Sequence, residues 1–69
     1  MIEVFKTNVA SMEEANRLAE KILLNIPNVK VNFDLEDCDK ILRVEGTLIK
    51  NEEVIKVTSS LGFRLEELT

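Results

Sequence analysis

The sequence contains no histidine, tryptophan or tyrosine, and it has only one cysteine, one proline and two glycines in 69 residues. Without histidine, the chain lacks the usual general base and the commonest catalytic metal ligand. Two glycines cannot supply a glycine-rich loop that cradles a phosphate. The single Cys38 cannot form a disulfide within the chain, which is typical of a reducing compartment. These absences argue against an independent enzyme, and no cofactor is expected.

Charge and hydropathy exclude further classes of protein. Thirteen acidic against nine basic residues give a net charge of −4, which repels polyanions, so no nucleic-acid partner is expected. No apolar run approaches the roughly 20 residues of a membrane-spanning helix, and Glu3 stands where a signal peptide has a basic leader. We therefore expect a cytoplasmic protein without a membrane partner, folded as a single domain over residues 1–69.

Two segments have the apolar spacing of amphipathic helices. In the first, Ser11 can cap a helix that begins at Met12, and Pro27 ends it near Asn25. In the second, Asn51 can act as the cap and Gly62 can end the helix as a left-handed residue. The residues expected to face a core are Met12, Ala15, Leu18, Ala19, Ile22 and Ile26 in the first helix, and Val54, Val57, Thr58 and Leu61 in the second.

Four further segments alternate apolar and polar residues, as strands with one buried face do. They cover residues 2–7, 29–35, 41–45 and 63–66, with a polar turn at 36–40 between the second and the third. The resulting order is βαββαβ. Right-handed connections then predict a ferredoxin-like α+β open-faced sandwich, in which two helices cover one face of a four-stranded antiparallel sheet.

The other face of this sheet is expected to meet water or a partner. The strand periodicity places mostly charged residues there: Glu3, Phe5, Lys30, Asn32, Asp34, Ile41, Arg43, Arg64 and Glu66. Phe5 is the sole aromatic in this set, whereas RNA recognition on such a sheet needs several aromatics and a basic field. A protein partner or a second copy could cover the apolar area around Phe5 and Ile41.

One motif suggests a family. It comprises a short strand followed by a capped helix, the second-strand pattern Asn28-Val29-x-Val31-x-Phe33-x-Leu35, a tight hairpin and a helix that ends in Gly62-Phe63. Over nearly the whole chain this arrangement resembles the heavy-metal-associated domain family of small copper chaperones and copper-pumping ATPase modules. The resemblance implies a Met-x-Cys-x-x-Cys loop before the first helix, where two thiolates bind Cu(I), a soft ion suited to sulfur ligands.

This chain departs from the family at that loop. Aligning the helix caps and the second strands places residues 10–15 on the loop, so that Met12 and Ala15 occupy the two cysteine positions. Neither is a thiolate, so no metal is expected there. Phe63 matches the family's residue beside the metal, and its alternative interpretation is a core aromatic that opens the last strand.

The turn at residues 36–40 holds two other candidates. Cys38 is either a reactive or metal-binding thiol or a tolerated turn residue, and we expect it at the end of the sheet opposite the loop before the first helix. The acids Asp34, Glu36, Asp37 and Asp39 could attract a hard cation, but their spacing matches no calcium loop, which favours solvated surface.

The leading hypothesis is a non-catalytic interaction module on a metal-chaperone-like scaffold, with an unidentified protein partner or a second copy. Its expected contact surfaces are the loop from Asn8 to Met12 with Phe63 nearby, and the open sheet face around Phe5 and Ile41. The alternative is residual binding of a soft metal ion, Cu(I) or Zn, by Cys38 alone or with Met12 of another chain. A small-molecule regulatory domain is a third possibility, for which the sequence offers no specific support.

Overall fold

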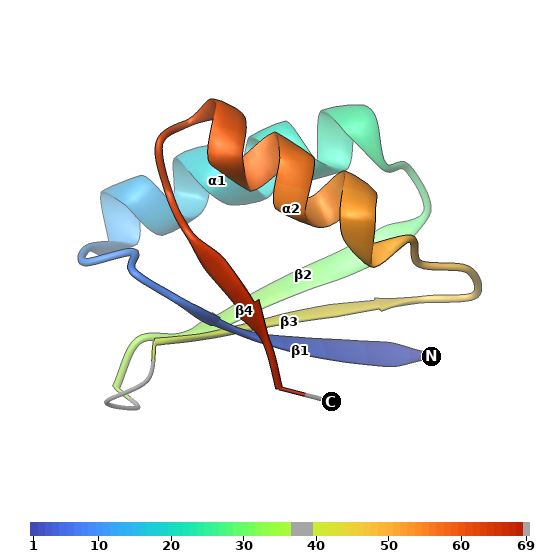
Figure 1. Ribbon diagram of the computed structural model, residues 1–69, viewed down its shortest axis with the longest axis horizontal. Helices are drawn as coiled ribbons and strands as arrows, with labels where there is room; N and C mark the ends of the chain where they lie inside the picture. Colours follow the sequence, from blue (N-terminus) through green and yellow to red (C-terminus); the bar gives the residue numbers. More distant parts are fainter. Residues whose placement is uncertain (37–39, 69) are drawn as a thin grey trace.

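Strands and helices alternate as the sequence predicts. A computed structural model describes residues 1–36 and 40–68, with the elements in the order βαββαβ (Figure 1). The strands are β1 (Ile2–Thr7), β2 (Val29–Asp34), β3 (Ile41–Gly46) and β4 (Leu65–Glu67), and the helices are α1 (Met12–Asn25) and α2 (Asn51–Ser60). The predicted ranges hold to within one residue, except that the last strand begins at Leu65 instead of Phe63.

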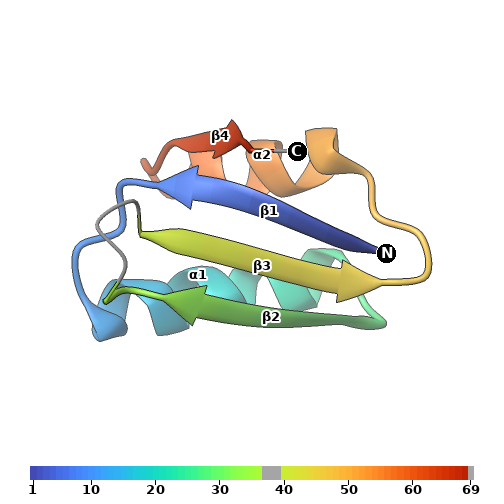
Figure 2. The same ribbon diagram turned by 90° about the horizontal axis from the view of Figure 1, so that it is seen from below.

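The strands form one sheet in the order β2-β3-β1-β4, in which every pair of neighbours is antiparallel. Both helices lie on one face of this sheet, and the opposite face is open (Figure 2). Helix α1 packs over β2, and α2 packs beside α1 and contacts β4. The ferredoxin-like α+β fold is therefore confirmed.

The core lies between the helices and the sheet. From the sheet, Phe5, Leu42 and Val44 are fully buried, and from the helices the buried side chains include Ala15, Leu18, Ile22, Val54 and Thr58. Met12, which we predicted on the same helix stripe as Ala15 and Leu18, is 61% exposed. It is the first residue of α1 and lies to the side of that stripe, so its side chain does not reach the core.

The face that we predicted for β1 is wrong. Glu3 pairs with Val44 and Phe5 pairs with Leu42, and residues directly opposite in an antiparallel pair share a face. Because Leu42 and Val44 are buried beneath the helices, Glu3 and Phe5 also face the helices. The residues of β1 on the open face are instead Ile2, Val4 and Lys6. For β2 and β3 the predicted faces are confirmed.

Helix α1 begins at the predicted cap. The backbone N–H of Glu14 donates to Ser11 Oγ at 3.2 Å, and the Glu14 carboxylate accepts from the N–H of Ala10 at 2.9 Å. The first bond satisfies an amide that the helix start leaves without a partner, and the second ties the residue before the cap to the first turn. Together they fix the direction in which the β1–α1 connection enters the helix.

Helix α2 differs from the prediction at its start and agrees at its end. Lys50, not Asn51, is the cap residue, and it makes no side-chain cap hydrogen bond. Gly62 has a φ of 87°, and the amides of Gly62 and Phe63 donate to the carbonyls of Ser59 and Thr58. This is a Schellman motif, in which glycine supplies the left-handed residue that follows the helix.

Candidate functional site

Three connections lie together at one end of the sheet. The N–H and the Oγ1 of Thr7 donate to the Lys40 carbonyl at 3.0 and 2.8 Å, and the N–H of Arg64 donates to Asn8 Oδ1 at 2.8 Å. The β1–α1 connection therefore lies beside the α2–β4 connection and beside Lys40, which precedes β3. The predicted proximity of the Asn8–Met12 loop to Phe63 agrees with this arrangement, since Phe63 adjoins Arg64.

The expected position of the turn between β2 and β3 is wrong. We predicted it at the end of the sheet opposite the β1–α1 loop, whereas Lys40 contacts Thr7 at the same end. The reason is topological, because β1 and β2 are each antiparallel to β3 and so run parallel to each other. Cys38, Asp37 and Asp39 lie outside the described residues, so the predictions for them stay untested.

The two residues at the family's cysteine positions lie in different environments. Met12 is 61% exposed, whereas Ala15 is 1% exposed and belongs to the core cluster. Phe63 is half-buried and packs against the same core cluster, as its alternative interpretation expects, but it does not open the last strand, which begins at Leu65. Within residues 1–36 and 40–68, no three Cys, Asp or Glu side chains gather where they could hold a metal ion.

Phe5 and Ile41 do not form the exposed apolar area that we expected on the open face. Phe5 is fully buried on the helix side. Ile41 lies on the open face, opposite Lys6 and Asp34, but only 6% of it is exposed. Neither side chain is available to a partner in this state of the protein.

Exposed apolar side chains do occur on the open face, over β1 and the end of the chain. Ile2 is 56% exposed and Val4 is half-buried. The N–H of Leu68 donates to the Val4 carbonyl at 3.0 Å, which extends the β4 ladder and places Leu68, 47% exposed, on the same face. We call Ile2, Val4 and Leu68 the open-face patch.

Charged residues occupy most of the rest of the open face. The strand registers place three basic and three acidic residues of the sheet on the open face: Lys6, Lys30, Arg43, Asp34, Glu45 and Glu66. Oppositely charged residues stand directly opposite each other twice, as Lys30 with Glu45 and Lys6 with Glu66. The face therefore presents an apolar patch on β1 and at the end of β4, with charges of both signs on the rest of the sheet.

The sequence analysis missed the open-face patch because both faces of β1 carry apolar residues. Ile2 and Val4 lie on one face, and Phe5 lies on the other with Glu3 and Thr7. The available signal was size, since a phenylalanine buries more apolar surface than a valine and is the stronger candidate for the core.

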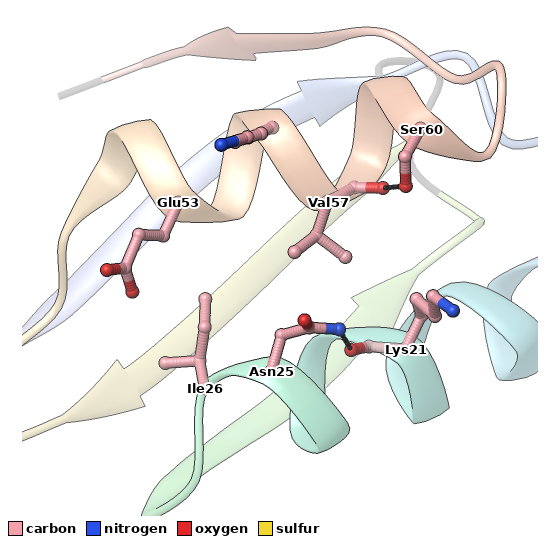
Figure 3. Close-up of a pocket in the computed structure, with 7 residues that line it drawn as sticks. Lys21, Asn25, Ile26, Glu53, Val57 and Ser60 are labelled. Carbon is pink, nitrogen blue, oxygen red and sulfur yellow. Dashed lines mark hydrogen bonds between the residues drawn. The ribbon is translucent and has the colours of Figure 1, made fainter.

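A groove also runs between the two helices. Its cavity of about 370 Å³ is lined by Lys21, Asn25 and Ile26 from the α1 side and by Glu53, Lys56, Val57 and Ser60 from α2 (Figure 3). Asn25 donates to the Lys21 carbonyl at 2.8 Å, and Ser60 donates to the Val57 carbonyl at 2.6 Å. These donors bond to carbonyls of their own helices, so the charged groups that the groove offers a ligand are the flexible ends of Lys21, Glu53 and Lys56.

The fold and the open-face patch define a ferredoxin-like α+β protein whose open sheet face carries an apolar patch beside charges of both signs. Comparison with protein-family models, with curated proteins and with solved structures finds no match for this chain. The resemblance to heavy-metal-associated domains accordingly stays a prediction. Across the described ranges, no helix is both long enough and apolar enough to cross a membrane.

Proposed function

We propose that this chain is a non-catalytic interaction module that binds a protein partner over the open face of its sheet. The observation that carries the proposal is the open-face patch. Ile2 and Leu68 are about half exposed there although the sheet has a helix-covered face available for apolar side chains. An apolar centre within a polar rim is the usual anatomy of a protein–protein interface.

The charges of this face favour a protein over a polyanion. The open face carries basic and acidic residues in equal number, and the chain as a whole has a net charge of −4. Binding to nucleic acid draws its affinity from a basic surface that releases counterions. A protein surface, in contrast, can offer an apolar contact to Val4 and charges of either sign to the rest of the open face.

The proposal is tested with Ile2→Glu and Leu68→Glu, which place a charge within the open-face patch. The matched control is Leu24→Glu, because Leu24 is 80% exposed on α1 and lies away from the open face. All three sites are exposed, so the circular dichroism spectra should match that of the wild type.

Tagged protein is then expressed in its source cells and bound proteins are quantified by mass spectrometry. We expect a stoichiometric partner that the wild type and Leu24→Glu retain and that both patch variants lose. Capture of the same proteins by all four forms, or of none by the wild type, contradicts the proposal.

Soft-metal binding is the alternative function, and one observation bears on it. Lys40 lies at the same end of the sheet as the loop that leads to Met12. From the sequence we had expected the turn before β3 and this loop at opposite ends of the sheet. Equilibrium dialysis against Cu(I) and Zn(II) distinguishes the two functions. Stoichiometric binding that disappears in Cys38→Ser supports metal handling and counts against the interaction module.

A further inference from the structure

Strand β2 forms an open edge of the sheet. It has six residues, whereas the strand at the opposite edge, β4, has three. Proteins commonly protect sheet edges by keeping the edge strand short, because an edge presents unpaired N–H and C=O groups to other chains. By that criterion the β4 edge is protected and the β2 edge is not.

The hydrogen-bond pattern identifies which groups of β2 point outward. Met1 and Gly46 exchange both of their backbone hydrogen bonds, at 2.8 and 3.0 Å, so the N–H and C=O groups of Gly46 point toward β1. Because such pairs alternate along an antiparallel ladder, the N–H and C=O groups of Glu45, Arg43 and Ile41 point toward β2. Their partners are Lys30, Asn32 and Asp34. The N–H and C=O groups of Val29, Val31 and Phe33 therefore point away from the sheet.

The side chains along this edge are incompletely covered. Val29, Val31 and Phe33 point toward the helices and pack against the core, yet each is only half-buried. Their neighbours on β3, Val44 and Leu42, are fully buried. A further strand beside β2 would pair with the outward backbone groups and cover these side chains in one step.

Helix α1 offers a second surface beside the same edge. Its side toward α2 is marked by Lys21 and Asn25, which line the groove between the helices. On the other side of the core stripe, at spacings of four, three and four residues, lie Met12, Asn16, Ala19 and Leu23. We call these four residues the outer stripe of α1.

The outer stripe carries no charge, although it is partly open to solvent. Met12 is 61% and Leu23 is 45% exposed. The charged residues of α1 occupy the remaining surface of the helix: Glu13, Glu14, Arg17, Glu20 and Lys21. Together with the core stripe, the uncharged sector covers about half of the helix circumference, more than the stripe of roughly 100° that a single core contact needs.

We propose that two copies of this chain pair antiparallel through their β2 strands, about a twofold axis at Asn32. In this register Val31 stands opposite Phe33 of the second copy, and Val29 stands opposite Leu35. Val31 and Phe33 are outward-facing residues of β2, so their two symmetric pairs exchange backbone hydrogen bonds, whereas Leu35 follows the end of β2 and its carbonyl accepts from Lys40 Nζ at 3.3 Å. On the open face Lys30 stands opposite Asp34 of the second copy, twice by symmetry.

The sequence of β2 selects this register. Moving the axis to Val31 leaves Asp34 beyond the paired segment and sets Lys30 opposite Asn32. Moving it to Phe33 sets Asp34 opposite Asn32 and Lys30 opposite Glu36, which follows the end of β2. If the axis lay between two residues, a residue whose backbone groups point away from its own sheet would stand opposite one whose backbone groups are already bonded to β3. The ladder between the two chains could then not form. Only the axis at Asn32 pairs both charges of β2 within the strand.

The paired molecule has one continuous eight-stranded sheet with all four helices on the same face. The two α1 helices then lie beside each other, antiparallel, with their outer stripes facing across the axis. Such an interface is isologous, as in most homodimers. It leaves the open-face patch uncovered, so this proposal stands independently of the proposed function.

Charge reversal tests the register. By sedimentation equilibrium, K30D and D34K should each weaken the dimer about tenfold, because like charges then stand directly opposite each other. The double variant K30D/D34K should restore wild-type affinity. Residues 30 and 34 are about 13 Å apart along one strand, so restoration reports contact between two chains. Urea titration of each variant verifies that the fold persists, since Asp34 also makes an interaction within its own chain.

Adjacent leucines test the contact of the helices. L23E places a charge on the outer stripe and should weaken the dimer, whereas the matched control L24E, one residue further along α1, should not. A wild-type chain that stays monomeric up to about 1 mM overturns the proposal. So does a dimer that K30D and D34K leave unchanged, that the double variant fails to restore, or that I2E on the open face disrupts.

Discussion

The backbone N–H of Arg64 donates a hydrogen bond of 2.8 Å to the Oδ1 of Asn8, a residue 56 positions earlier in the chain. The Asn8 side chain acts here as the next acceptor of the β1–β4 ladder, in which Thr7 pairs with Leu65. Because β4 has only three residues, this bond is a substantial part of what holds the last strand to the sheet.

Replacing Asn8 with alanine should therefore loosen β4. Loss of the acceptor leaves the exposed Arg64 amide to water and should lower the free energy of unfolding by up to about 1 kcal/mol, as measured by urea titration. The Arg64 amide should also exchange faster with deuterium. Asn8→Asp keeps an acceptor oxygen and should retain most of the protection. Unchanged exchange in Asn8→Ala would refute this role.

Gly62 tests the end of α2. Its φ of 87° is disfavoured for a residue with a Cβ, although nothing lies within 4 Å of a Cβ built there. Gly62→Ala should thus cost about 1–2 kcal/mol for backbone reasons alone. Gly62→Asn should cost less, because asparagine tolerates the left-handed region. Equal costs for the two substitutions, measured by thermal unfolding, would contradict the backbone explanation.

Gly46 tests a close approach between β3 and the start of β2. A Cβ at Gly46 would lie 2.9 Å from Val29 Cγ1 and 3.4 Å from the Asn28 carbonyl oxygen. Gly46→Ala should destabilise the protein by about 1–3 kcal/mol through overpacking. Val29→Ala removes the nearest of these atoms. The double variant should consequently be less destabilised than the sum of the two single variants, and additive costs in urea titrations would count against this contact.

Neighbouring residues of β1 test its two faces. Phe5 is fully buried, so Phe5→Ala should cost about 3–5 kcal/mol, enough to unfold a large share of a small domain. Val4 is half-buried on the open face, and Val4→Ala should cost less than about 1 kcal/mol. Circular dichroism at 25 °C and urea titration measure both effects. The reverse ranking would restore the face that the sequence alone suggested for Phe5.

The sequence by itself determined the elements of this protein. The Ser11 cap, the stop at Gly62 and the alternation through β2 each act over a few residues, so their outcome can be read from the residues concerned. Right-handed connections between those elements then led to the βαββαβ sandwich. The cap predicted at Asn51 is one residue too late, which shows that local sequence does not fix a helix boundary to a single residue.

Only the tertiary structure decided which surfaces are available to a partner. Both faces of β1 hold apolar residues. Packing beside Leu42 and Val44 on β3 determines which of these faces lies under the helices. The exposure of β2 follows from its position at the edge of the strand order, to which every strand of the sheet contributes. A periodic pattern reports that a strand has two faces, but the identity of the buried face depends on residues distant in the chain.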